Sequence, residues 1–322
     1  MRAIQVEVPG GPEAMRLVDV PTPAPGPGQA LVRLAASGVN FVDVYFRTGL
    51  YKADVPVRLG SEGAGTVEAI GPGVTEVAVG DRVAWAMIRG SYAEHAVVPA
   101  AMLVPVPDAI DFVTAAGILL QGMTAHYLTQ STFPLKPGDA CLVHAAAGGT
   151  GALIAQMAHE AGARVFGTVS TDAKAAIAKA AHVDHVIRYT TEDFAAEVKR
   201  LTDGRGVDVV YDSVGQATFE GSLNSLRPRG TLALFGQSSG PVPPFDPTIL
   251  NGKGSLYLTR PSLAHYIATR DELLWRARDV FSGLQSGALT FRLQQTFPLA
   301  DAADAHRLLE GRGTMGKVVL TI

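Results

Sequence analysis

A run of small residues near the middle of the chain has the composition of a phosphate-binding loop. The segment Ala145-Ala-Ala-Gly-Gly-Thr-Gly151 contains three glycines and no large side chain. Small residues let a backbone approach a pyrophosphate closely, and a following helix offers free N–H groups and the positive end of its dipole. Against the pattern G-x-G-x-x-G, Ala146 replaces the first glycine. The loop therefore predicts a dinucleotide site only where a strand precedes it and a helix follows.

A second polar group would select the dinucleotide. Ser170, Thr171, Asp172 and Lys174 follow the apolar run 164–169. A carboxylate at such a strand end usually binds the ribose 2′-hydroxyl of NAD, whereas hydroxyls and a lysine suit the charge of a 2′-phosphate. The group therefore favours NADPH. Two alternatives remain open. Asp172 could instead bind the ribose of NAD, or it could only cap the next helix, in which case Lys174 would lie on an exposed first turn.

The elements around these residues have the pattern of a parallel sheet covered by helices. Strands that are apolar on both faces, alternating with helices, are typical of an α/β domain. This context strengthens the dinucleotide interpretation of the glycine loop. The predicted strands are 140–145, 164–169, 185–189, 207–212 and 230–236, and the predicted helices are 152–161, 173–181, 192–202 and 218–226.

Residues 1–110 have a different texture. Short alternating runs, such as 30–35, 65–70 and 81–86, are separated by glycine and proline turns. Many short strands at close spacing predict an antiparallel barrel or sandwich.

The end of the chain, from about residue 259, combines helices with a final strand. Residues 271–284 and 299–309 have helical periodicity, and residues 316–322 predict a strand. We expect this strand to rejoin the first domain.

Bulk properties exclude several classes of partner. A net charge of -3 and a pI of about 6.2 give no electrostatic reason to expect nucleic acid. The most apolar stretch, 140–158, is interrupted by His144, by glycines and by Gln156, so it does not predict a membrane span. The alternating start does not predict a secretory signal. The single cysteine, Cys141, excludes an internal disulfide and fits a cytoplasmic location.

Eight short motifs run along the whole chain. They are GVNFVDVY (38–45), RTGLY (47–51), GSEGAG (60–65), QGMTA (121–125), AAAGGTG (145–151), YDSVG (211–215), FGQSSG (235–240) and YLTRP (257–261). In these motifs the chain resembles the zinc-independent quinone oxidoreductases of the medium-chain dehydrogenase/reductase family, the zeta-crystallin group.

The resemblance implies an architecture. It consists of a mostly β GroES-like catalytic domain (1–124), a Rossmann NADPH-binding domain (125–258) and a return segment (259–322) that completes the catalytic domain. The active site would lie in the cleft between the domains, and the protein would form homodimers through its Rossmann domains.

The resemblance also implies cofactor contacts. Ser170, Lys174 and Tyr189 would surround the 2′-phosphate, and Phe41, Tyr45 and Thr124 would lie near the nicotinamide. The implied NADPH-binding residues are Phe41, Tyr45, Thr124, Tyr127, Gly148, Gly149, Thr150, Gly151, Ser170, Thr171, Lys174, Tyr189, Ser213, Phe235, Gly236, Ser238, Ser239, Leu258, Arg260 and Arg312.

Zinc ligands are missing at the places where zinc-dependent relatives carry them. Those relatives place Cys where Asn40 stands and His where Ser61 stands. One cysteine cannot form a four-cysteine structural zinc lobe. His182 and His185 could share a helix face, but no further ligands have suitable spacing. We therefore expect no metal site.

Quinone reduction needs less from the protein than alcohol oxidation, because the acceptor is electron-poor and its reduced oxygens can take protons from water. Asn40 could donate a hydrogen bond to a quinone carbonyl or only order a turn. Tyr45 and Tyr51 could stack on the acceptor and donate a proton, or only pack. Arg260 could stabilise developing negative charge.

The function predicted from these features is reduction of quinones by NADPH without zinc. One alternative is reduction of enones or 2-alkenals by the same cofactor. Another is a non-catalytic NADPH-binding protein, crystallin-like or RNA-binding. His144 and Cys141 are expected to be core residues rather than catalysts.

Overall fold

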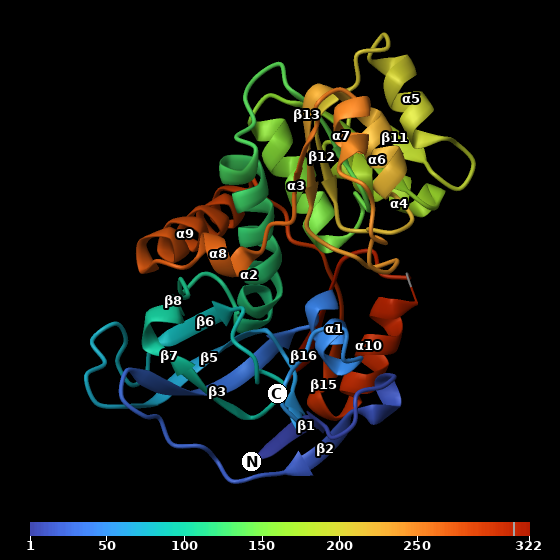
Figure 1. Cartoon of the computed structure of the whole chain (residues 1–322). Coiled ribbons are helices and arrows are strands. Elements are labelled where there is room, and N and C mark those ends of the chain that lie inside the picture. The colour runs from blue at the N-terminus through green and yellow to red at the C-terminus, as the bar shows by residue number, and fades with distance from the viewer. Residues whose placement is uncertain (312) are drawn as a thin grey trace. The chain divides into compact units, whose positions relative to one another are not determined.

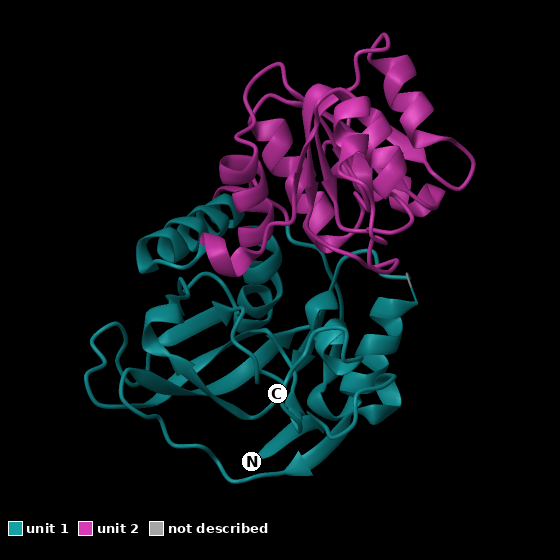
Figure 2. Cartoon of the chain, in the orientation of Figure 1, with its two compact units in different colours: residues 1–122, 267–285, 291–322 teal, residues 123–266, 286–290 magenta. Residues whose placement is uncertain are grey.

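The computed structural model describes residues 1–311 and 313–322 (Figure 1). The chain divides into two compact units (Figure 2). The first comprises residues 1–122, 267–285 and 291–322, and the second comprises residues 123–266 and 286–290. Among the described residues, no helix is long and apolar enough to cross a membrane.

The first unit is mostly β, as its alternating runs predicted. Its larger sheet has the order β15-β16-β3-β5-β6-β8, with β7 paired to β3, and a smaller sheet has the order β2-β1-β4. The strands are β1 (Arg2–Val6), β2 (Arg16–Asp19), β3 (Gln29–Gly38), β4 (Val57–Arg58), β5 (Glu62–Ile70), β6 (Arg82–Ala86), β7 (His95–Pro99), β8 (Val104–Pro105), β15 (Leu293–Pro298) and β16 (Lys317–Thr321).

The C-terminal strand returns to the first unit, which confirms the expectation for residues 316–322. β16 pairs antiparallel with β3, with Thr321 opposite Ala36. Alternate residues of β16, Val318 and Leu320, are buried in a core with Val57 and Leu59. The main helices of this unit are α1 (Phe41–Arg47), α2 (Phe112–Tyr127), α9 (Arg270–Ser286) and α10 (Ala302–Glu310); α2 ends in the second unit.

The second unit contains the predicted parallel sheet. Its order is β11-β10-β9-β12-β13-β14, and every neighbouring pair is parallel. Consecutive residues of these strands, such as Leu142 and Val143, are fully buried, as is expected of strands covered on both faces. The strands are β9 (Ala140–Val143), β10 (Arg164–Val169), β11 (His185–Arg188), β12 (Val207–Asp212), β13 (Leu226–Leu234) and β14 (Tyr257–Thr259).

The helices of this unit follow the predicted alternation. They are α3 (Gly149–Glu160), α4 (Asp172–Ala180), α5 (Phe194–Leu201), α6 (Phe219–Ser225), α7 (Thr248–Gly252) and α8 (Leu263–Tyr266). Helix α3 begins earlier than its predicted start at 152, so the glycine loop itself forms the first turn.

The second unit also extends beyond the expected boundary at 258. Strand β14 adds to the sheet by pairing with β13, and the unit continues to Tyr266. A three-residue strand has too weak a periodicity to be recognised in the sequence.

Candidate active site and cofactor-binding site

The glycine loop joins β9 to the N-terminus of α3. Gly148 is the residue before the helix, and no side chain caps the first turn. The N–H groups of that turn are therefore oriented as an anion-binding helix terminus requires. A Cβ atom at Gly151 would lie 2.3 Å from the carbonyl oxygen of Ala145, so only glycine permits this tight turn. The local geometry fits a pyrophosphate.

The predicted cofactor residues of the second unit, apart from Thr124 and Tyr127 in α2, lie at one edge of its sheet. All six strands are parallel, so their carboxyl ends lie together, where ligands of such sheets bind. The centre of this edge is the switch point between β9 and β12. Gly148–Gly151 follow β9; Ser170, Thr171 and Lys174 follow β10; Tyr189 follows β11; Ser213 follows β12; Phe235, Gly236, Ser238 and Ser239 follow β13; Leu258 lies in β14 and Arg260 follows it.

The corner formed by the ends of β10 and β11 contains a cation that sequence reasoning missed. Arg188 is paired in register with Val169, and its guanidinium donates to the Asp172 carboxylate at 2.8 Å. The Asp172 side chain is 86% exposed. Asp172 is thus already bound to an arginine. Two cations, Lys174 and Arg188, thus lie beside Tyr189, together with Asp172 and with Glu192, whose carboxylate accepts from the Arg188 backbone N–H at 2.7 Å. The two cations are suited to hold a 2′-phosphate.

Thr171, rather than Asp172, caps helix α4. The Thr171 hydroxyl accepts a hydrogen bond from the Lys174 N–H at 3.3 Å. Hydroxyl capping is an ordinary way to satisfy a first-turn donor. The capping role suggested for Asp172 is therefore wrong, whereas Lys174 does lie in the first turn of α4.

Asp212, the last residue of β12, ties together the loops that follow β12 and β13. Its carboxylate accepts from the N–H groups of Val214 and Gly215 at 2.8 and 3.0 Å, and from the Thr218 hydroxyl at 2.7 Å. Its carbonyl oxygen accepts from the Phe235 N–H at 2.9 Å. The loops containing Ser213 and Phe235 are consequently fixed against each other.

His144 is a core residue, as predicted. It is 1% exposed, and its two ring nitrogens lie 2.9 Å from the Thr168 hydroxyl and 3.0 Å from the Ser222 hydroxyl. Ser222 in turn donates to Asp212 at 2.8 Å. Burial lowers the pKa of His144, which favours the neutral ring. Its role is to support Asp212. Cys141 is also fully buried, as expected.

Other predicted residues of the second unit have varied environments. Arg260 is exposed and donates to the carbonyl oxygen of Leu234 at 3.0 Å. Thr124 is almost completely buried, and the Tyr127 ring stacks on Tyr266 with 4.3 Å between centroids. Contacts of these residues with a cofactor stay predictions. Arg312 lies outside the described residues.

Aromatic side chains from α1 and the following turn form a cluster in the first unit. The Tyr45 ring lies 6.3 Å from Phe41 and 5.2 Å from Tyr51, measured between centroids. Tyr51 also meets Phe46 edge-on at 5.6 Å. The structure therefore brings together the predicted residues Phe41, Tyr45 and Tyr51. Tyr45 is buried, whereas Tyr51 is half-buried, so of these two tyrosines Tyr51 presents the more accessible ring face to a planar acceptor.

Asn40 precedes α1 and belongs to a buried ionic cluster. Its amide oxygen accepts from the Lys317 ammonium at 2.7 Å, and its amide nitrogen donates to Glu62 at 2.9 Å and to the Gly38 carbonyl at 3.3 Å. Lys317 and Glu62 form an ion pair of 2.8 Å and are 1% and 0% exposed. Both N–H donors of Asn40 are thus used inside the protein. A hydrogen bond to a quinone carbonyl stays a prediction, and it would require one of these bonds to be given up.

Glu62 connects this cluster to three elements. Its carboxylate accepts from Lys317 in β16, from Asn40 before α1 and from the Leu120 N–H in α2, the last at 2.7 Å. A Cβ atom at Gly38 would lie 2.3 Å from the Glu62 carboxylate, so glycine is needed beside it. The sequence did not indicate that Lys317 joins this cluster, because only strand pairing brings the C-terminal strand beside residue 40.

Asp43 forms a second buried polar group beneath α1. Its carboxylate accepts from the Ser61 hydroxyl at 2.7 Å and from the Asn40 backbone N–H at 3.1 Å. Burial raises the pKa of Asp43 to about 6, although the Ser61 hydrogen bond opposes that shift. The residues that stand where zinc enzymes carry Cys and His, Asn40 and Ser61, therefore both form hydrogen bonds within the protein.

A buried chain of hydrogen bonds joins α1 to α10. Arg47 donates to His306 Nδ1 at 2.9 Å and forms a bidentate pair with Glu310 at 2.6 and 2.9 Å. Arginine has no acceptor, so His306 Nδ1 must accept and its Nε2–H must donate to the Tyr92 hydroxyl, 3.0 Å away. Burial, with Arg47 nearby, lowers the pKa of His306 to about 3. This histidine is structural.

Comparisons with known proteins find family models that match both halves of the chain. A model of the alcohol dehydrogenase GroES-like domain matches residues 26–108, and a model of the zinc-binding dehydrogenases matches residues 149–270. The quinone oxidoreductase of Pseudomonas aeruginosa is 45% identical over 321 residues, which cover 99% of each chain. The chain belongs to the quinone oxidoreductase family.

Two further proteins are similar to this member of the quinone oxidoreductase family. The structure of Escherichia coli quinone oxidoreductase complexed with NADPH matches it with a TM-score of 0.98 at 41% identity, and each chain is covered in full (100%). A 2-haloacrylate reductase of a Burkholderia species is 44% identical over 97% of this chain and 96% of its own.

The histidine pair considered for a metal is not on one helix in this family member. His182 lies in the turn after α4, where its ring stacks on His159 at 4.4 Å, and His185 begins β11. The expectation that they share a helix face is wrong, because the chain turns at His182 with a φ of 64°. In the part of the chain that the structure describes, no three His, Cys, Asp or Glu residues form a group able to hold a metal ion.

Proposed function

We propose that the protein reduces quinones with NADPH. The observation that carries this proposal is the cofactor edge of the second unit, where an uncapped glycine-rich helix terminus lies on the same sheet edge as Lys174 and Arg188. Bound there, NADPH would supply the hydride. The family relatives named quinone oxidoreductase support the choice of acceptor.

The chain's own residues have three roles in this proposal. Gly148–Gly151 and the α3 terminus hold the pyrophosphate, while Lys174 and Arg188 hold the 2′-phosphate. The Tyr51 ring, with Tyr45 packed against it, holds a planar acceptor. Arg260 stabilises negative charge that develops on the acceptor oxygen. Protons for the reduced oxygens come from water, so no residue needs to act as a strong base.

Steady-state kinetics with NADPH and NADH against small quinones test the proposed function. We expect turnover with quinones and a higher kcat/KM with NADPH. The absence of turnover with every quinone, together with turnover of enones, would refute it.

Lys174→Ala and Arg188→Ala test the cofactor assignment. Each variant should raise KM for NADPH by about tenfold or more and change KM for NADH little, because only NADPH has the 2′-phosphate. The control is Arg200→Ala, which removes an exposed cation of α5 that forms an ion pair with Glu197. Equal effects on both cofactors would place the 2′-phosphate elsewhere.

Reduction of an activated carbon–carbon double bond is the second candidate, and the similarity to a 2-haloacrylate reductase favours it. Such a reaction delivers hydride to the β-carbon and needs a proton at the α-carbon. Tyr51→Phe, which removes one hydroxyl from the aromatic cluster, should lower enone reduction more than quinone reduction. Equal losses of both activities would indicate that water, and not the Tyr51 hydroxyl, supplies the proton.

We also propose that the protein forms a homodimer through β14. Strand β14 ends the sheet, and among the described residues only β13 pairs with it. Tyr257 on this strand is 62% exposed. An unpaired edge with an exposed ring favours pairing with a second copy. Light scattering should give twice the chain mass for the wild type and a single chain mass for Tyr257→Asp.

We propose in addition that the protein is located in the cytoplasm, which cell fractionation tests.

A further inference from the structure

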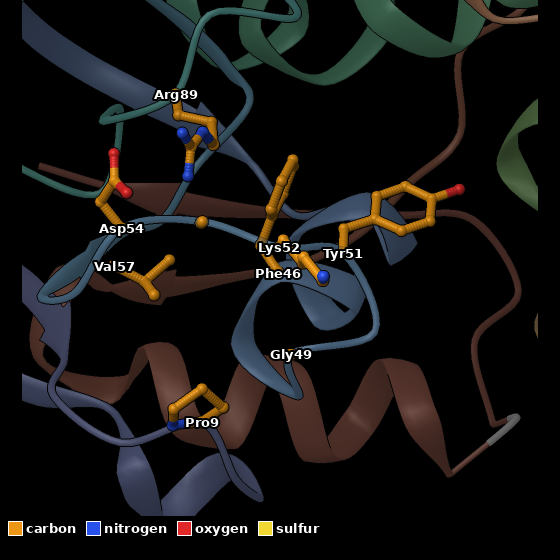
Figure 3. A pocket seen from close by; sticks show the side chains of 9 residues that line it. Pro9, Phe46, Gly49, Tyr51, Lys52, Asp54, Val57 and Arg89 are labelled. Carbon is orange, nitrogen blue, oxygen red and sulfur yellow. The ribbon is translucent and has the colours of Figure 1, made fainter.

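A pocket of about 550 Å³ adjoins the aromatic cluster of the first unit (Figure 3). It is formed by the end of α1, by the turn 49–57 and by Arg89 from the loop after β6. Its chemically distinctive lining residues are Phe46, Tyr51, Lys52, Asp54 and Arg89.

The pocket has more positive than negative side chains. Lys52 and Arg89 contribute two cations and Asp54 one carboxylate, and all three are exposed. Among the residues that the structure describes, no carboxylate forms an ion pair with Lys52 or Arg89. The Arg89 guanidinium instead lies 4.6 Å over the Phe46 ring. That contact orders the guanidinium through a ring face and leaves its N–H donors for an anion.

Ring contacts connect the pocket with the surface proposed for the acceptor. Tyr51 contacts Tyr45 at 5.2 Å and Phe46 at 5.6 Å, and Phe46 in turn lies under Arg89. In Figure 3 the Tyr51 hydroxyl points away from Arg89 and Asp54, so its ring separates that hydroxyl from the charged part of the pocket. Tyr51 and Arg89 line the same pocket, so an acceptor whose ring lies against Tyr51 can extend a substituent towards Arg89.

We propose that this pocket binds an anionic substituent, a carboxylate or sulfonate, on the acceptor whose ring lies against Tyr51. This inference rests on the proposed reductase function and adds a substrate class to it. A planar guanidinium can hold such a group through two parallel hydrogen bonds, and Lys52 adds a second positive charge. The protein thus distinguishes anionic from neutral acceptors by charge.

The test compares 2-methyl-1,4-naphthoquinone with 1,4-naphthoquinone-2-sulfonate. The measured quantity is the ratio of kcat/KM for the sulfonate to kcat/KM for the neutral quinone, taken for each variant relative to the wild type. Differences in intrinsic reactivity cancel in this comparison. We expect Arg89→Gln and Lys52→Gln each to lower the ratio about fivefold, and Asp54→Asn to raise it about threefold. Salt near 0.5 M should reduce these differences.

The matched control is Arg58→Gln, which removes an exposed cation of β4 that does not line the pocket. An unchanged ratio in this variant supports a local site. Ratios that are unchanged in both Arg89→Gln and Lys52→Gln, or that fall equally in Arg58→Gln, would overturn the proposal. The opposite change in Asp54→Asn cannot result from a loss of folding.

A binding measurement separates this proposal from the proposed function. Naphthalene-2-sulfonate and 2-methylnaphthalene accept no hydride, so calorimetric titration of the protein with each reports affinity alone. Tighter binding of the sulfonate, weakened in Arg89→Gln, supports the pocket even if no quinone is reduced. Equal affinity of the two compounds would overturn it even if quinones are reduced.

Discussion

Lys317 is the residue on which the buried ionic cluster of the first unit depends. Its ammonium is the only cation bonded to Glu62 among the described residues, and both groups are almost inaccessible to water. Breaking a buried pair by removing one partner leaves an uncompensated charge. We expect Lys317→Met to lower the free energy of unfolding by about 3–5 kcal/mol, measured by urea denaturation at pH 7.

Two further variants test whether an uncompensated buried charge causes this loss of stability. Lys317→Met combined with Glu62→Gln should recover part of the loss, because no buried charge remains. Lys179→Met, on an exposed face of α4, should leave stability within about 0.5 kcal/mol of the wild type. If Lys317→Met is as stable as the wild type, the ammonium does not compensate Glu62.

At the scale of elements, the turn between β9 and α3 depends on Gly151. A Cβ atom there would meet the Ala145 carbonyl oxygen at 2.3 Å, so the loop must shift away from the helix terminus. We expect Gly151→Ala to raise the dissociation constant for NADPH by about tenfold or more, measured by fluorescence titration. Gly252→Ala in α7, where an added Cβ meets nothing within 4 Å, is the control. Equal affinity in both variants would show that the loop does not hold the pyrophosphate.

The attachment of α1 to α10 makes stability depend on pH through His306. Burial keeps the pKa of His306 at about 3 in the fold, against 6.5 in an exposed histidine. The unfolded chain therefore takes up a proton below pH 6.5 that the fold excludes, so stability falls as the pH falls through that window. Between pH 7 and pH 5 we expect a loss of about 2 kcal/mol from this group.

Urea denaturation of the wild type and of His306→Gln at several pH values isolates that contribution. The variant should be less stable at pH 7, and the gap should narrow towards pH 5. The raised pKa of Asp43 acts in the opposite sense, but Asp43 is present in both proteins. Parallel curves for the two proteins would show that His306 takes up its proton in the fold as readily as in the unfolded chain.

At the scale of the whole molecule, cofactor binding should be visible as stability. NADPH at 100 times its dissociation constant should add about 2.7 kcal/mol to the free energy of unfolding, because it binds only the folded chain. NADH at the same concentration should add less, since Lys174 and Arg188 have no 2′-phosphate to hold. Scanning calorimetry measures both shifts. Equal shifts from the two cofactors would contradict the role of that corner.

The sequence by itself predicted the layers of both units and the glycine loop that joins a strand to a helix in the second unit. Strands 164–169 and 207–212 have the predicted limits, because apolar runs bounded by turn residues define buried parallel strands. Local chemistry also suggested Gly148–Gly151, Ser170 and Lys174 as cofactor residues, since a phosphate loop and a strand end are short patterns that depend on neighbours in the chain.

Only the tertiary structure decided which distant residues complete those patterns. Arg188 binds Asp172 because β10 and β11 pair in one particular register. Lys317 reaches Asn40 and Glu62 because β16 returns to pair with β3. Strand register and chain return depend on packing across the whole core, and no local pattern encodes them. The glycine loop and Lys174 could thus be recognised in the sequence, whereas the pairing of Arg188 with Asp172 beside them became visible only in the folded chain.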